Sequence, residues 1–117
     1  IAKFNHGLTL IAQGRSDEAI KVYEDLIQAF PQFPQPYNNL AGVFASLGNL
    51  ERAESLLRQG LELDDRYRLL RKNLGSLLIH RASKIYLEAI DGQRETTTSV
   101  DNEPIVLQPF DMLNPIP

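Results

Sequence analysis

The chain has 117 residues, of which 43% are hydrophobic, and its formal net charge at pH 7 is −3. This length fits one small domain that can bury a core, and the charge gives no general attraction to nucleic acid. The chain contains no cysteine, which excludes a disulfide framework and a thiolate zinc site, and no apolar run is long enough to cross a bilayer.

Apolar spacing and turn residues predict four helices, over residues 2–13, 16–30, 35–47 and 50–63. Gly14 and Gly48 each follow one of these helices, where a glycine with a left-handed backbone ends a helix at little steric cost. Ser16 and Asn49 then stand where a side chain can cap the next helix. Pro36 suits the first position of the third helix, where a proline lacks only an amide that has no helical partner.

Residues that stand 34 positions apart agree in chemical type, which indicates a repeat architecture. The small residues Gly7, Ala41 and Gly75 form one such column, and we expect them where two antiparallel helices approach closely. The other columns are Leu10 with Phe44 and Leu78, Gly14 with Gly48, Ala19 with Ala53, and Tyr23 with Leu57.

The third unit of the repeat departs from this pattern. After Leu78 the expected turn is missing, although Ala82, Tyr86 and Ala89 resume the spacing of a second helix if five residues are deleted. We therefore predict one continuous helix of about 24 residues, roughly 36 Å long, that caps the stack.

These columns resemble the tetratricopeptide family, whose unit is a 34-residue helical hairpin. The residues that fill the family pattern in the second unit are Tyr37, Leu40, Ala41, Phe44, Gly48, Ala53 and Leu57. The resemblance implies an all-α antiparallel helix-hairpin stack over residues 1–91, with units 1–33 and 34–67 and a shortened third unit, 68–91. Residues 92–117 then form a polar linker and an extended apolar tail. Residues 36–41 and the shortened unit are also similar to a group of bacterial repeat proteins without a defined role.

The resemblance implies a concave groove, lined by the first helix of each unit, that binds another polypeptide. Its candidate residues are Phe4, Leu8, Ile11, Gln35, Asn38, Asn39, Gly42, Ala45, Leu69, Lys72, Ser76 and Ile79. Family members that clamp a terminal carboxylate carry lysine and asparagine in the first unit, whereas Phe4 and Leu8 stand here and only Asn39 matches. We therefore expect an apolar or extended polypeptide segment as the ligand.

One alternative concerns the apolar residues of the first helix, which would line one wall of this groove. The chain opens at Ile1 in the middle of a helical pattern, so we expect a segment upstream of it. Phe4, Leu8 and Ile11 would then pack under an upstream helix instead of facing a ligand.

The tail is too apolar for a disordered end and too rich in proline for a helix, with Ile105, Val106, Leu107 and Phe110 in close succession. We expect it to dock in the groove of its own or of a neighbouring copy, near the basic third unit. The acidic residues Asp101, Glu103 and Asp111 favour that position, and the domain would then serve self-assembly, with a homodimer as one form. The alternative is that the tail packs across the back of the second helices.

Residues 66–87 contain six Lys and Arg and no acid. Aromatic side chains do not alternate with these cations, so a solvated face is favoured and we do not expect nucleic acid as a partner. His6, expected to face the core, and His80, expected near the groove, lack the spacing of a metal pair or of a base beside a nucleophile. We expect neither catalysis nor a cofactor or metal; the remaining alternative is an accessory domain of a larger enzyme.

Overall fold

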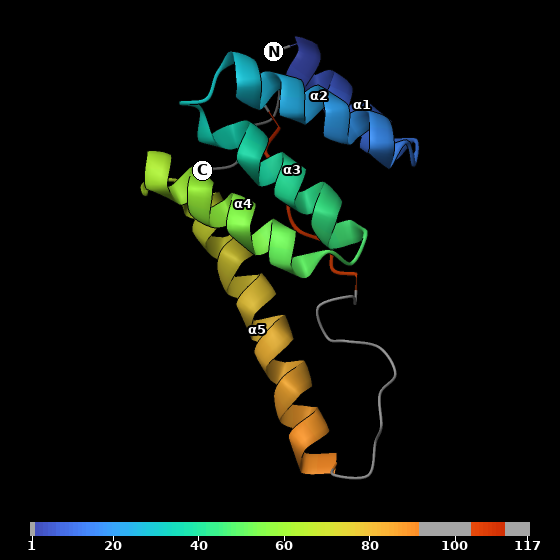
Figure 1. The fold of residues 1–117 in the computed structure, drawn as a ribbon, viewed down its shortest axis with the longest axis vertical. Helices are drawn as coiled ribbons and strands as arrows, with labels where there is room; N and C mark the ends of the chain where they lie inside the picture. Colours follow the sequence, from blue (N-terminus) through green and yellow to red (C-terminus); the bar gives the residue numbers. More distant parts are fainter. Residues whose placement is uncertain (1, 92–103, 112–117) are drawn as a thin grey trace.

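The computed structural model describes residues 2–91 and 104–111, and it consists of five helices joined by short turns (Figure 1). These are α1 (Ala2–Ala12), α2 (Ser16–Ala29), α3 (Pro34–Ser46), α4 (Leu50–Leu63) and α5 (Arg68–Asp91). The described residues form no strand, so the all-α prediction is confirmed. None of the helices in this described part is long and apolar enough to pass through a membrane.

The turns within the first two hairpins follow from their glycines. Gly14 and Gly48 have φ angles of 74° and 84°, in the left-handed region that favours glycine, and each ends the preceding helix as predicted. Asn49 caps α4, because its side chain accepts a hydrogen bond of 3.2 Å from the backbone amide of Arg52.

Two predictions about helix starts are wrong. Ser16 is the first residue within α2 and not its cap, and Arg15, which stands at the cap position, makes no capping hydrogen bond through its side chain. Helix α3 begins at Pro34, two residues before Pro36, and its cap residue Phe33 has extended backbone. Pro34 therefore takes the first helical position that we expected for Pro36, which is the third residue of the helix.

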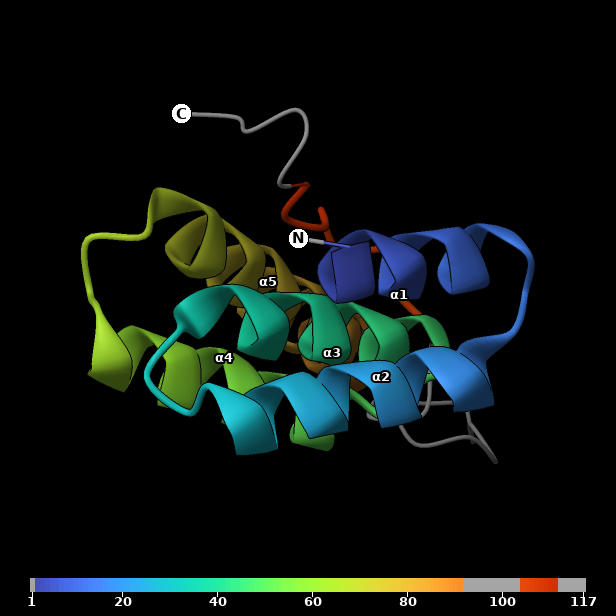
Figure 2. The ribbon, with the colours of Figure 1, turned by 90° about the horizontal axis from the view of Figure 1, so that it is seen from above.

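Successive helices pack against one another, α1 on α2, α2 on α3, α3 on α4 and α4 on α5. Seen from above, α1, α3 and α5 form an arc, and α2 and α4 lie on its outer side (Figure 2). The buried apolar side chains between these layers include Leu10, Ala19, Tyr23, Leu40, Ala41, Val43, Leu50, Ala53, Leu56, Leu57, Leu70 and Leu77. This is the arrangement of a helix-hairpin stack, in which each unit buries its apolar face against its neighbours.

The column of small residues behaves differently in each unit. A Cβ atom on Gly7 would lie 2.5 Å from Cζ of Tyr23, so α1 and α2 approach closely there. Ala41, the equivalent residue of the second unit, is fully buried. At Gly75 an added Cβ would meet no described atom within 4 Å, so the prediction of a close approach is wrong at this position. The reason is that α5 continues past Gly75, and within residues 2–91 and 104–111 no second helix folds back onto it.

Helix α5 is continuous over 24 residues, as predicted, but it packs on the stack mainly through its first half. Its buried residues are Leu70, Asn73 and Leu77, all in that half. Ala82, Tyr86 and Ala89 are exposed, so they do not take the core role that the second-helix spacing predicted. Without a turn the helix runs straight on, and its second half leaves the body of the molecule (Figure 1).

Candidate peptide-binding groove

Residues 104–111 lie in the hollow of the arc, between α1 and α5 and against α3 (Figure 2). The backbone amide of Ile105 donates a hydrogen bond of 2.9 Å to the carbonyl of Ala45, near the end of α3. Leu107 is buried at 6% exposure, whereas Val106 between them is 89% exposed. Over residues 105–107, side chains therefore alternate between the helices and solvent, as they do along an extended chain. This alternation changes at the end of the segment, where Pro109 is exposed and Phe110 packs against the core.

Two asparagines hold the backbone of this segment. Nδ2 of Asn73 donates to the carbonyl of Gln108 at 2.8 Å, and Oδ1 of Asn73 accepts from the amide of Gln108 at 3.1 Å. Asn39 makes the same pair of bonds to Phe110, donating to its carbonyl at 2.8 Å and accepting from its amide at 2.6 Å. Each asparagine thus satisfies both backbone groups of one residue, and the two residues held are two apart, which is the side-chain period of an extended chain.

The two asparagines occupy the same position in successive units, because they stand 34 residues apart in a chain whose repeat is 34. Asn38 joins them: its Nδ2 donates to Oδ1 of Asn39 at 3.2 Å and to the carbonyl of Gln108 at 3.1 Å, and its Oδ1 accepts from Asn73 at 2.8 Å. The three asparagines are between 0% and 3% exposed. A buried amide is costly unless it is hydrogen-bonded, so the segment supplies partners that this network needs.

Tyr23 anchors the network at the first hairpin. Its hydroxyl donates to the carbonyl of Phe4 at 3.2 Å and accepts from Nδ2 of Asn39 at 3.2 Å. Burial raises the pKa of Tyr23 to about 12; the hydrogen bond from Asn39 lowers it in part, and the charge of Asp111 raises it further. Tyr23 therefore remains a neutral donor far above neutral pH, and it ties the groove asparagine to the backbone of α1.

Aromatic rings close the groove around Phe110. Its ring lies edge-on to Phe4 with a centroid distance of 6.0 Å, and it also contacts Tyr67 at 6.3 Å. The hydroxyl of Tyr67 accepts a hydrogen bond of 2.6 Å from Nε2 of Gln35. Phe4 is 5% exposed between Tyr23 and Phe110, so an upstream helix is not needed to bury it.

The residues predicted from the sequence divide into three groups. Phe4, Asn38, Asn39 and Ala45 contact the 104–111 segment, and Gln35 acts through Tyr67. Four others are half-buried: Leu8, Ile11, Gly42 and Leu69. The predicted residues of α5 that are exposed are Lys72, Ser76 and Ile79.

Asn73 and Tyr67 were not among the groove residues predicted from the sequence. Asn73 could have been found from the repeat itself, since it stands 34 residues after Asn39, but the position chosen in the third unit was its neighbour Lys72. His6 is exposed, so the prediction that it faces the core is wrong, because α1 buries Phe4, Gly7 and Leu10 on its other side. Asp101 and Glu103, the other acidic tail residues, lie outside the described residues.

The described residues contain no group of three His, Asp or Glu side chains placed to hold a metal ion. A family model described as tetratricopeptide repeat matches residues 10–74, which is more than half of the chain. Repeats of this kind generally mediate protein–protein interaction and are typically not catalytic. The stacked hairpins, the repeat period and this match together place the chain in the tetratricopeptide repeat family.

Proposed function

We propose that the arc of α1, α3 and α5 is a groove that binds an extended polypeptide through its backbone, and that residues 104–111 occupy it as a ligand in cis. The observation that supports this proposal is the repeated pair of bonds at Asn39 and Asn73. An asparagine that bonds both the amide and the carbonyl of one residue recognises a backbone and not a side chain. The groove therefore accepts different sequences provided that they are extended.

Side-chain preferences come from the positions that face the helices. Ile105, Leu107 and Phe110 pack against the core, so we expect a ligand with apolar residues at the equivalent places. Pro109 is exposed, and its position needs no amide, because the bonded residues on either side of it are Gln108 and Phe110. A proline between the two held residues is thus compatible with binding and removes an amide that could pair with another strand.

The same column contains a third asparagine, Asn5, 34 residues before Asn39. Its Oδ1 is buried and has no hydrogen-bond partner among the described residues. The segment runs from Asn73 on α5 to Asn39 on α3, so we expect Asn5 on α1 to hold a ligand residue two positions beyond Phe110. Met112 holds that place in the sequence and lies outside the described residues. A longer ligand would satisfy this amide, which otherwise carries an unpaired buried acceptor.

The test uses the full chain with a protease site introduced between Gly92 and Glu103. After folding and cleavage, the segment is held only by its contacts, and a fluorescent peptide with the sequence of residues 104–111 is added in excess. Anisotropy measures its binding. We expect Asn73→Ala to weaken binding about tenfold to a hundredfold, since two hydrogen bonds to a buried backbone are lost. Gln32→Ala, which removes an exposed amide in a turn, is the matched control.

Modified peptides test backbone recognition directly. A methyl group on the amide of Gln108 removes the donor that Asn73 accepts, and we expect a loss similar to that of Asn73→Ala. The same methyl group on Val106, whose side chain is 89% exposed, should change little. A peptide extended by two residues should bind more tightly, and Asn5→Ala should remove that gain. Equal affinities for the two methylated peptides would contradict the proposal.

A second candidate function is self-assembly, in which the segment enters the groove of a neighbouring copy. The observation in its favour is that the ligand belongs to the chain itself. Chains with differently labelled tails, mixed after unfolding and refolding together, distinguish the two. Energy transfer between the labels, together with a mass of two chains, would indicate exchange of tails, whereas a single-chain mass indicates binding in cis.

A further inference from the structure

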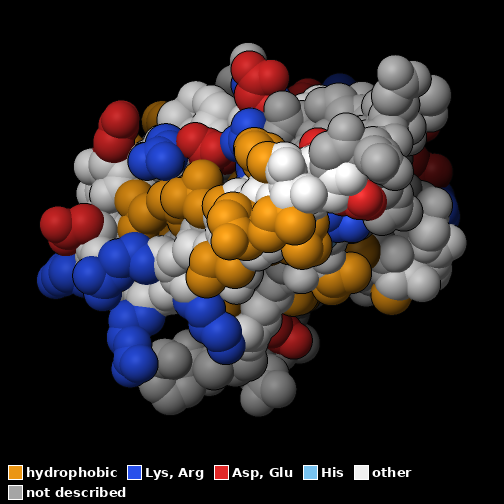
Figure 3. Space-filling view, turned by 90° about the horizontal axis from the view of Figure 1, so that it is seen from below, with side chains coloured by type: hydrophobic (Ala, Val, Ile, Leu, Met, Phe, Trp, Pro, Cys, Tyr) orange, Lys and Arg blue, Asp and Glu red, His pale blue; other side chains and the backbone are white. Residues whose placement is uncertain are grey.

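The second half of α5 presents apolar side chains to solvent. Ile79, Tyr86 and Ile90 are 68%, 67% and 64% exposed, which is high for residues of this type. On a helix they share one face with four further residues, and we call this face the α5 stripe. Its members are Leu78, Ile79, Ala82, Ile85, Tyr86, Ala89 and Ile90. The view along the molecule from below shows apolar side chains gathered on this side, with Lys and Arg next to them (Figure 3).

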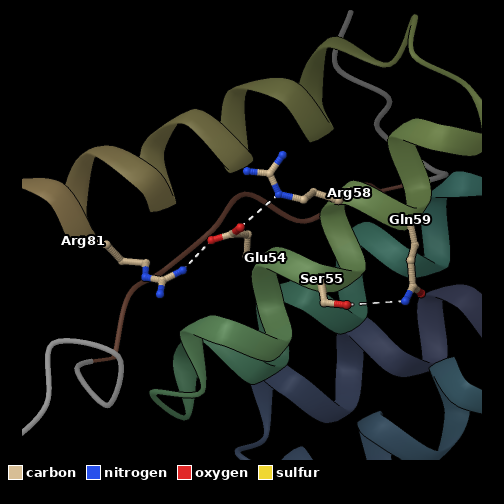
Figure 4. A network of polar contacts seen from close by, with 5 residues as sticks. All are labelled: Glu54, Ser55, Arg58, Gln59 and Arg81. Carbon is tan, nitrogen blue, oxygen red and sulfur yellow. Dashed lines mark hydrogen bonds and ion pairs between the residues drawn. The ribbon is translucent and has the colours of Figure 1, made fainter.

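The α5 stripe does not face the rest of the domain. The side of α5 that faces α4 carries Leu70 and Leu77, which are buried, and then Arg81, which forms an ion pair with Glu54 (Figure 4). Glu54 also bonds Arg58 of α4 at 2.9 Å. Beyond residue 81 the half-buried positions on this side are Lys84 and Glu88, both charged. Polar residues thus lie toward the stack and apolar residues away from it, the reverse of a surface helix that needs no partner.

The pattern of the α5 stripe matches one particular partner. Numbered as heptads, the stripe has Ile79 and Tyr86 at the first core position and Ala82 and Ala89 at the second. Large and small residues therefore alternate. In an antiparallel pair of identical helices, each first position meets a second position of the other helix, so that Tyr86 meets Ala82 and Ile79 meets Ala89. In a parallel pair, Tyr86 would meet Tyr86 and Ala82 would meet Ala82, which gives a clash and a void.

The composition of the α5 stripe permits self-pairing. No residue of the α5 stripe is charged, so self-pairing brings no like charges into contact. Of residues 92–103, the only large apolar side chain in the sequence is Val100, so that segment lacks the composition to cover the stripe.

We propose that the α5 stripe is an antiparallel dimer interface between two copies of this chain. Seven side chains per copy would bury about 1,000 Å² in total, near the lower limit for specific interfaces. We therefore expect a dimer with a dissociation constant on the order of 10 µM. This pairing is independent of the groove, because the α5 stripe contains none of the residues that hold the 104–111 segment.

Sedimentation equilibrium of the full chain between about 1 µM and about 1 mM tests the proposal. We expect the mass of the wild type to rise from that of one chain to that of two as the concentration increases. Tyr86→Asp should stay at the mass of one chain at every concentration, and Leu87→Asp should show the same rise as the wild type. Leu87 is the matched control, since it is 59% exposed but lies off the stripe. Ala82→Tyr and Tyr86→Ala should each weaken the dimer, and the double variant should restore it, because the exchanged residues meet again only in an antiparallel pair.

Orientation is measured with spin labels, for which the absence of native cysteine is an advantage. A label on Arg71→Cys should lie about 40 Å from its counterpart in an antiparallel pair and about 10–20 Å in a parallel one. A single-chain mass of the wild type at every concentration would overturn the proposal. The α5 stripe would then have to contact residues 112–117 or another protein. A dimer that persists in Tyr86→Asp, or a short label distance, would overturn it equally.

Discussion

Gly7 and Gly75 stand at equivalent positions of the repeat, yet alanine at these two sites should change stability in opposite directions. A methyl group on Gly7 would lie 2.5 Å from Cζ and 2.7 Å from the hydroxyl oxygen of Tyr23. Tyr23 is fully buried, and its hydroxyl is held by Phe4 and Asn39, so the ring has no room to move aside. A methyl group on Gly75 would meet no described atom within 4 Å.

The expected magnitudes follow from two opposing effects. Alanine stabilises a helix interior by about 0.5–1 kcal/mol relative to glycine, because glycine loses more backbone entropy on folding. At Gly75 only this effect operates, so the free energy of unfolding should rise by about 0.5–1 kcal/mol. At Gly7, overpacking costs about 1–3 kcal/mol and a disturbed Tyr23 hydrogen bond costs about 1 kcal/mol more. The net result for Gly7→Ala is a loss of about 1–3 kcal/mol.

Urea unfolding followed by circular dichroism measures both changes, with the midpoint shifting at constant slope. A 1 kcal/mol change corresponds to roughly 4–8 °C in the melting temperature of a domain of this size. Gly42→Ala serves as a second positive control, since an added Cβ there also meets no described atom within 4 Å. If Gly7→Ala and Gly75→Ala both lowered the midpoint, the contrast drawn between the first and third units would be refuted.

Three further predictions concern single side chains. Tyr23 has a pKa of about 12 in the folded protein and an ordinary value of 10.0 in the unfolded chain, so its contribution to stability is complete below pH 10 and is lost as pH rises toward 12. The free energy of unfolding of the wild type should therefore fall by up to about 3 kcal/mol relative to that of Tyr23→Phe between pH 10 and 12, measured by urea midpoints. Asn49→Ala should cost about 1 kcal/mol because it removes the cap of α4, whereas Ser16→Ala should cost less than half of that; equal losses would contradict the observed caps. Phe110→Ala removes the ring contacts with Phe4 and Tyr67. The hydrogen-bonded backbone amides of the 104–111 segment should then exchange hydrogen with solvent about tenfold faster, and an unchanged exchange rate would exclude these rings as the anchor of the segment.

The helices and the turns between them could be predicted because their signals are local. Gly14 and Gly48 determine where two helices end, and the predicted bounds of the first four helices differ from the observed ones by one residue at most. The continuity of α5 was predicted from a missing turn. The packing of α5 could not be predicted, since Tyr86 has the spacing of a core residue but is exposed, and no helix of the described residues follows α5 to cover it.

The groove was predicted in part. Its location on the first helices came from the family resemblance, and Asn38 and Asn39 were among the residues named. The role of asparagine was not apparent, because an isolated amide has no preferred partner until a backbone lies against it. Comparison of Asn5, Asn39 and Asn73 along the repeat would have shown the column, and the repeat period is therefore a better guide to this site than hydrophobicity.

The spacing of Asn39 and Asn73 links ligand binding to the curvature of the stack. Packed helices lie about 8–10 Å apart, whereas alternate residues of an extended chain are only about 6.7 Å apart. Both asparagines bond Gln108 and Phe110 with least distortion when the inner faces of α3 and α5 converge, which an inward bend provides. We therefore expect a bound segment to favour the bent form of the stack, and a force that straightens the arc to weaken binding of the segment.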